Sequence, residues 1–155
     1  KRSIHTPLAI ILVGIPTSGK TTWCKKMRTY TISTVISRDI IRLALFGKNY
    51  KQNLTDEHRV NNIVDLYLKD AMDKGSNIIL DNCHCKESYI IPLLRNLEAR
   101  GYLVKIKFFT ISLWKAYYRN IKRKLLTGKW IPIKVIKSMK QNYDKINRKK
   151  YEGYN

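Results

Sequence analysis

The chain has 155 residues, and 44% of them are hydrophobic, which fits one globular domain and excludes a wholly disordered chain. Its longest apolar run, Leu8 to Val13, is much shorter than the roughly 20 residues of a membrane-spanning helix. The 31 Lys and Arg against 11 Asp and Glu give a net charge of +20. This excess favours polyanionic partners, nucleic acid first and an anionic membrane surface second. We predict a single domain over residues 1–155.

Short apolar segments alternate with helical ones along the chain. The four segments predicted as strands are rich in apolar or β-branched residues, and they are 8–13, 31–36, 77–80 and 102–109. The segments predicted as helices are 20–28, 38–46, 55–74, 87–100, 113–126 and 132–146. This alternation predicts an α/β fold with a parallel sheet of about four strands and helices on both faces.

Three of the predicted helices carry apolar stripes that are expected to face the core. In the third helix, for which Thr55 is the expected N-cap, the stripe is Val60, Ile63, Val64, Tyr67, Leu68, Ala71 and Met72. In the helix over 113–126 it is Trp114, Tyr117, Tyr118, Ile121 and Leu125. In the last helix, which has Pro132 in its first turn, it is Ile133, Ile136, Met139, Tyr143 and Ile146.

The turn after the first strand reads GIPTSGKT over residues 14–21 and fits the P-loop pattern G-x-x-x-x-G-K-[ST]. Its glycines let backbone N–H groups converge on phosphate oxygens, Lys20 neutralises β/γ charge, and the Thr21 hydroxyl holds Mg²⁺. The residues expected around ATP are Gly14, Ile15, Pro16, Thr17, Ser18, Gly19, Lys20, Thr21 and Thr22. The motif, between a strand and a helix, predicts binding of ATP or GTP with Mg²⁺.

Two aspartates follow predicted strands and are expected at the same edge of the sheet as the P-loop. Asp39 is a candidate general base on an acceptor hydroxyl, or else it only caps its helix. Arg42, one turn on, shares its face and is a candidate ligand of a second phosphate, or else a solvated arginine. Asp81 is a candidate for reaching Mg²⁺ through water, or else part of an Asp-Asn turn.

The cysteines indicate chemistry other than disulfides or zinc. Cys83 and Cys85 are too close in sequence to form a disulfide easily, and the chain has an odd number of cysteines, three. Consecutive residues rarely all reach one tetrahedral ion, so Cys83-His84-Cys85 is interpreted as a loop near the active site rather than a metal site. The cysteine usage predicts a reducing, intracellular compartment.

The strongest concentration of charge lies near the carboxyl end. Residues 115–150 contain thirteen Lys and Arg and one acid, Asp144. In the last helix Lys134, Lys137 and Lys145 are expected on the outside. Such a run is usually a solvated face, but arginines here also suit a lid over ATP, and an open basic surface suits a nucleic-acid strand.

Several segments together resemble the bacteriophage-type polynucleotide 5′-kinases, in the same order along nearly the whole chain. The matching segments are 14–21, Ser37 to Arg42, Ile78 to Asn82 and Trp114 to Arg123, with a similar tail over Ile131 to Met139. The resemblance implies a P-loop kinase fold with a helical lid over about residues 113–131.

By this resemblance each matched position carries a role. Lys20 and Thr21 contact ATP·Mg²⁺, Asp39 is the general base on the 5′-hydroxyl, and Arg123 contacts the transferring phosphate. Arg119 lies in the lid near the nucleotide, and Asp81 takes the acidic position that ends the third strand. The implied acceptor-side residues are Arg38, Arg42, Asp81 and Asn82.

The chain also departs from that family. The family commonly has Asp-x-Thr-Asn or Asp-Thr-Asn where this chain has Asp81-Asn82-Cys83-His84, so the acceptor contacts of this loop are open. Many relatives are fused to a 3′-phosphatase, whereas this sequence has no Asp-x-Asp-x-Thr motif. We therefore expect no phosphatase activity in this chain and a separate phosphatase or ligase as partner.

The prediction is ATP-dependent, Mg²⁺-dependent transfer of the γ-phosphate to 5′-hydroxyl ends of RNA or DNA, as in end healing before ligation. No membrane partner is expected, and the expected location is the cytoplasm, including that of a virus-infected host cell. Two alternatives stay open: a P-loop kinase of a nucleoside or other small metabolite, and a non-catalytic nucleotide-sensing module that binds nucleic acid.

Overall fold

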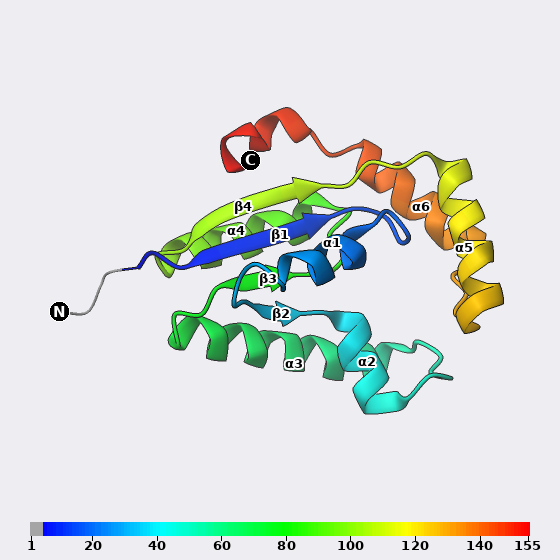
Figure 1. The fold of residues 1–155 in the computed structure, drawn as a ribbon, viewed down its shortest axis with the longest axis horizontal. Helices are drawn as coiled ribbons and strands as arrows, with labels where there is room; N and C mark the ends of the chain where they lie inside the picture. The colour runs from blue at the N-terminus through cyan, green and yellow to red at the C-terminus, as the bar shows by residue number, and fades with distance from the viewer. Residues whose placement is uncertain (1–4) are drawn as a thin grey trace.

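A four-stranded parallel sheet forms the centre of the computed structural model, which describes residues 5–155 (Figure 1). Its strands are β1 (Leu8–Val13), β2 (Thr34–Ile36), β3 (Ile78–Leu80) and β4 (Leu103–Phe108). They lie in the order β2-β3-β1-β4, with Ile11 of β1 paired to Leu80 on one side and Ile106 on the other. The predicted α/β class and parallel sheet are confirmed.

Helices cover both faces of the sheet unequally. On one face, the core joins the sheet to the last four helices and to the carboxyl-terminal residues. On the other, the short helix α1 packs Cys24 against Leu12 and Ile79. The helices are α1 (Lys20–Met27), α2 (Arg38–Phe46), α3 (Leu54–Asp73), α4 (Glu87–Ala99), α5 (Leu113–Thr127) and α6 (Ile133–Asp144), followed by a 3₁₀ helix, η1 (Arg148–Tyr154). No helix within residues 5–155 is long and apolar enough to cross a bilayer.

Two predicted helix starts and two predicted core positions are wrong. Asn53, not Thr55, caps α3, because its Oδ1 accepts the Asp56 N–H at 2.9 Å. Pro132 is the N-cap of α6 and precedes its first turn. Tyr67 of α3 and Ile133 of α6 are largely exposed, because each lies at the border of its apolar stripe.

Four of the five residues predicted as the core stripe of α5 face outward, whereas the fifth, Tyr117, packs against the core. Trp114, Tyr118, Ile121 and Leu125 are at least half exposed, whereas Ala116 and Asn120 on the opposite side are fully buried. The inner face of α5 therefore combines the small Ala116 and the polar Asn120 with the partly buried Leu113 and Tyr117.

Candidate active site

Lys20 is held inside the turn between β1 and α1. Its Nζ donates to the carbonyl oxygens of Gly14 at 2.7 Å and Ile15 at 2.9 Å, and the residue is only 8% exposed. These contacts fix the ammonium group in the concavity of the P-loop. A cation in that position offsets phosphate charge with little rearrangement.

The backbone of this loop has room for no side chain at one point and requires a left-handed conformation at others. A Cβ on Gly14 would lie 2.6 Å from Ser18 Oγ and 3.0 Å from Phe109 Cβ. Gly19 has φ +103°, a value that glycine adopts without strain, and Thr17 has φ 68°. The loop thus forms a compact cradle of backbone amides, and the residues present fit a nucleotide polyphosphate.

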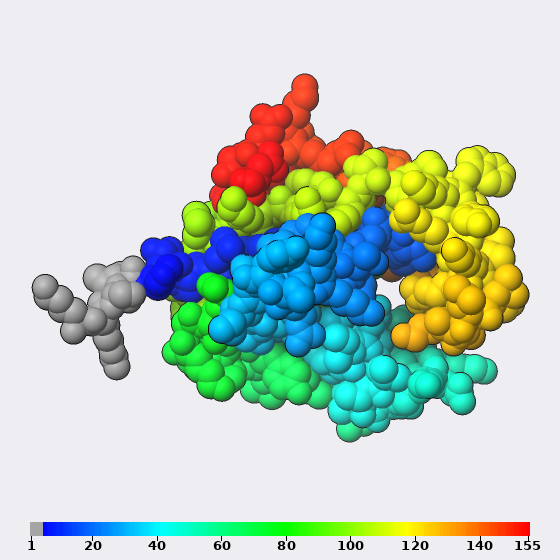
Figure 2. Space-filling view, viewed as in Figure 1, coloured from blue at the N-terminus to red at the C-terminus, as the bar shows by residue number. Residues whose placement is uncertain are grey.

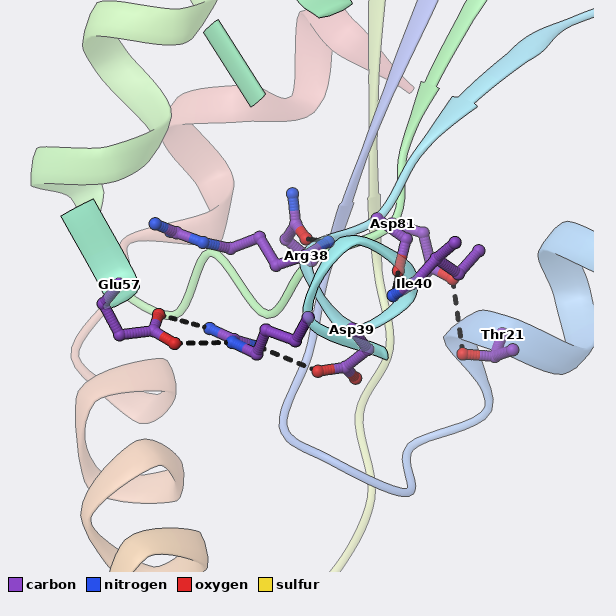
Figure 3. Close-up of polar contacts among 9 residues, drawn as sticks. Thr21, Arg38, Asp39, Ile40, Glu57 and Asp81 are labelled. Atoms are coloured by element: carbon purple, nitrogen blue, oxygen red, sulfur yellow. Dashed lines mark hydrogen bonds and ion pairs between the residues drawn. The ribbon is translucent and has the colours of Figure 1, made fainter. Parts of the chain in front are cut away.

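Asp81 and Thr21 place two oxygen ligands beside this cradle. The Thr21 hydroxyl donates to Asp81 Oδ2 at 3.3 Å, as the dashed line in Figure 3 shows. Burial raises the pKa of Asp81, while the Lys20 charge and the Thr21 hydrogen bond oppose that rise. Hydroxyl and carboxylate oxygens are ligands that Mg²⁺ accepts, so this pair fits the metal predicted here.

Two side chains fix the start of α2: one follows β2 and the other follows β3. Ser37 is the N-cap, because its Oγ accepts the Ile40 N–H at 3.4 Å, so Asp39 does not cap this helix. Asn82, just after β3, accepts the Arg38 N–H at 2.9 Å. The structure therefore brings Arg38 and Asn82 together and ties α2 to the same sheet edge as Asp81.

Asp39 lies in a chain of charged groups that the sequence did not reveal. Arg42 Nη1 donates to Asp39 Oδ1 at 2.8 Å, and Arg42 also donates twice to Glu57 of α3, at 2.8 and 2.7 Å (Figure 3). The Asp39 side chain is 82% exposed, whereas those of Arg42 and Glu57 are mostly buried. Arg42 thus bridges the carboxylates of Asp39 and Glu57. Its contact to an acceptor phosphate stays a prediction.

We expect Glu57→Gln to weaken the pair between Arg42 and residue 57. The hydrogen bond from Arg42 lowers the pKa of Glu57, so the ionised form stabilises the fold at neutral pH, and this contribution falls as the pH drops through the folded-state pKa. The variant should lose about 1 kcal/mol of unfolding free energy at pH 7 and lose less at acidic pH. Chemical denaturation at several pH values measures both.

Asp70→Asn is the matched control on the same helix, since it removes an exposed pair to Lys74. That change should cost well below 1 kcal/mol. An equal loss in the two variants would mean that the Glu57–Arg42 pair is an ordinary surface contact.

Helix α5 contacts the P-loop at Thr17. Arg119 Nη1 donates to the Thr17 carbonyl at 2.9 Å, and the Thr17 hydroxyl donates to the Ala116 carbonyl at 3.3 Å. The Asn120 side chain makes two hydrogen bonds to the backbone of Ile131. Its Nδ2 donates to the Ile131 carbonyl at 2.8 Å, and its Oδ1 accepts the Ile131 N–H at 3.2 Å. Arg119 therefore lies beside the P-loop, and its predicted role near the nucleotide stays a prediction.

Arg123 lies one turn beyond Arg119 on α5. Its Nε is buried and has no hydrogen-bond partner among the described residues, and the same is true of Arg38 Nε. Figure 2 shows a hollow between α2 (cyan) and the carboxyl-terminal half of α5 (gold). A buried donor without an acceptor is costly, so Arg123 fits a position that an anionic ligand completes.

The Cys83-His84-Cys85 segment supports the P-loop. The Cys83 carbonyl accepts the Gly14 N–H at 3.0 Å, and His84 Nδ1 lies 2.9 Å from the Leu12 carbonyl oxygen. Burial lowers the pKa of His84 to about 4, so its ring is neutral at pH 7 and donates to that carbonyl. Within residues 5–155 no group of three or more His, Cys, Asp or Glu side chains is placed to hold a metal ion.

The arrangement of loop, helix and sheet agrees with comparison to known families. Residues 10–146 match the family model described as an AAA domain, which is most of the chain. The chain belongs to the AAA domain family. The match includes the P-loop, α2 and α5.

Two relatives of this AAA domain support the resemblance seen in the sequence. A protein of Autographa californica nuclear polyhedrosis virus that carries the name bifunctional polynucleotide kinase/RNA ligase is 25% identical over 127 residues, covering 74% of this chain and 18% of its own length. A chain of the Pnkp1/Rnl/Hen1 RNA repair complex superimposes with a TM-score of 0.80 at 25% identity, covering 96% of this chain and 48% of that one.

A third relative, known from its structure, shares the fold but is named for a different acceptor. A gluconokinase from Sinorhizobium meliloti 1021 aligns with a TM-score of 0.54 and 18% identity, covering 89% of this chain and 75% of that one. This chain spans less than half the length of the first two relatives. Two of the three relatives are named as kinases, one of polynucleotides and one of gluconate.

Proposed function

We propose that this chain transfers the γ-phosphate of ATP to 5′-hydroxyl ends of RNA or DNA. The observation that carries the proposal is that the P-loop around Lys20 is contacted by Arg119 of α5, and that the start of α2, which carries Asp39, is bound to Asn82 at the end of β3. A net charge of +20 supports a polyanionic acceptor. The relatives named for a polynucleotide kinase and for an RNA repair complex support the same acceptor class.

Each residue would act at a stated place. Lys20 and the loop amides hold the β- and γ-phosphates, Asp39 takes the proton of the 5′-hydroxyl, and Arg123 faces the migrating phosphoryl group. Thr21 and Asp81 are the residues that would hold Mg²⁺, which supplies charge neutralisation when bound. Arg42 orients Asp39 from the Glu57 side.

The proposal extends to partners and location. A separate phosphatase or ligase would act on the ends before or after this step. The cytoplasm of a cell, including a virus-infected host cell, is the proposed location, since all three cysteines are free thiols.

A transfer assay with four acceptors tests the proposal. The protein is incubated with γ-labelled ATP, Mg²⁺ and matched 5′-hydroxyl RNA and DNA oligonucleotides, and in parallel with gluconate and with a mixture of nucleosides. We expect label on an oligonucleotide end and none on the small molecules. Label on a small molecule alone would mean a metabolite kinase, and ATP binding without transfer would mean a nucleotide-sensing module.

Arg123→Ala should slow catalysis more than it weakens acceptor binding. A lid arginine contacts charge that develops during transfer, so kcat should fall by about 10² while KM for the acceptor changes little. Steady-state kinetics measure both constants. Arg95→Ala, an exposed arginine on α4, is the control. A change in KM alone would place Arg123 in the basic surface instead of the lid.

Acceptor binding should weaken steeply as salt rises. Each phosphate neutralised on a single strand adds about 0.7 to the slope of log K against log salt. Charge reversal at Lys134, Lys137 or Lys145, all exposed, should lower this slope and leave single-turnover transfer from saturated complex unchanged. Lys69→Glu on α3 is the control, and a flat salt response would indicate an uncharged acceptor.

A further inference from the structure

The outward face of α5 carries large apolar side chains that the fold does not use. Trp114 is 82% exposed and Tyr118 is 66% exposed, on the side opposite to the fully buried Ala116. The two rings are four residues apart, so they lie next to one another on the helix surface. Aromatic side chains so exposed in a row usually mark an interaction surface.

The charge around these rings indicates what kind of partner fits. Helix α5 has no acid, and its cations are Lys115, Arg119, Lys122, Arg123 and Lys124. Lys115 and Lys122, which flank the rings, are exposed. Lysine is depleted in protein–protein interfaces, whereas exposed aromatic rings between cations are typical of surfaces that bind single-stranded nucleic acid.

The position of the rings relative to the catalytic edge sets which part of a strand they reach. The inner face of α5 contacts the P-loop at Thr17, so Trp114 lies on the same helix turns but on the outside. At 1.5 Å per residue, Trp114 is about 20 Å along the helix from Thr127, the end near the hollow. A strand whose 5′ end lies at Asp39 would have to extend several nucleotides to reach the rings.

We propose that Trp114 and Tyr118 form a stacking platform for bases of a single-stranded acceptor, several nucleotides from its 5′ end. This proposal rests on the proposed function for the position of the 5′ end. Bases stack on the two rings, and Lys115 and Lys122 neutralise the neighbouring phosphates. The platform adds affinity for long acceptors and makes no contact with the reacting atoms.

Acceptor length separates this platform from the catalytic site. In the double variant Trp114→Ala/Tyr118→Ala, we expect the Kd of a 5′-hydroxyl 20-mer to rise about tenfold or more, because each stacked base contributes substantially. The KM of a trinucleotide, which does not reach the platform, should stay within twofold. The matched control is Leu66→Ala/Tyr67→Ala on α3, which removes two side chains of similar exposure.

Direct binding keeps this test independent of catalysis. Binding of the 20-mer should quench the fluorescence of Trp114, and Trp114→Phe should remove most of the quenching while retaining affinity. This readout holds even if the protein transfers phosphate to no end, so failure of the proposed function is distinguishable. Unchanged 20-mer affinity in the double variant would overturn the platform, and a simultaneous change in sedimentation would then assign the face to a protein contact.

Discussion

Lys20→Ala is expected to lower the rate of phosphate transfer by about 10³ without unfolding the protein. The ammonium group lies in the concavity of the P-loop, 2.7 and 2.9 Å from two loop carbonyls, so it can move to phosphate oxygens with little rearrangement. Its removal leaves the charge of the migrating group uncompensated. Single-turnover transfer of labelled phosphate gives the rate, and thermal melting reports the fold.

Lys25→Ala serves as the control, because Lys25 is an exposed lysine of the same helix. That variant should transfer at the parental rate. Near-normal turnover by a folded Lys20→Ala protein would contradict the assignment of this loop to ATP.

Asp39→Asn should abolish most transfer while the protein remains as stable as the parent to within about 1 kcal/mol. An amide cannot take a proton from a 5′-hydroxyl, and general-base catalysis contributes about 10²–10⁴ in rate. The stability cost is small because Ser37 caps α2 and the Asp39 side chain is 82% exposed. A labelled-ATP transfer assay beside chemical denaturation measures both quantities.

ATP affinity should change little in this variant, since the P-loop is untouched. Asp65→Asn, an exposed acid on α3, is the control for loss of one negative charge. If Asp39→Asn transfers phosphate at the parental rate, Asp39 is only the surface partner of Arg42.

The sheet and the nucleotide loop were predictable because both depend on local patterns. Unbroken apolar runs such as Leu8–Val13 indicate strands buried on both faces. The spacing of the P-loop motif predicts a phosphate-binding turn between a strand and a helix. The order of the strands was not predictable, because it depends on which crossover each helix makes.

Two features of the site depend on tertiary contacts and so escaped the sequence. Glu57 is fifteen residues from Arg42 in the sequence, and nothing in its own neighbourhood indicates the pair. The stripe of α5 was assigned to the core because helical spacing cannot tell a core from a binding face. A single signal was available: no acid accompanies the cations of that helix.

Asn120 has a consequence for how the lid can move. Its buried amide joins α5 to the backbone of Ile131, so the helix and the turn after it are fastened into one piece. Bending inside that piece would leave the buried Nδ2 and Oδ1 of Asn120 without hydrogen-bond partners, which is costly. Any movement of α5 would therefore carry the turn up to Ile131 along with it.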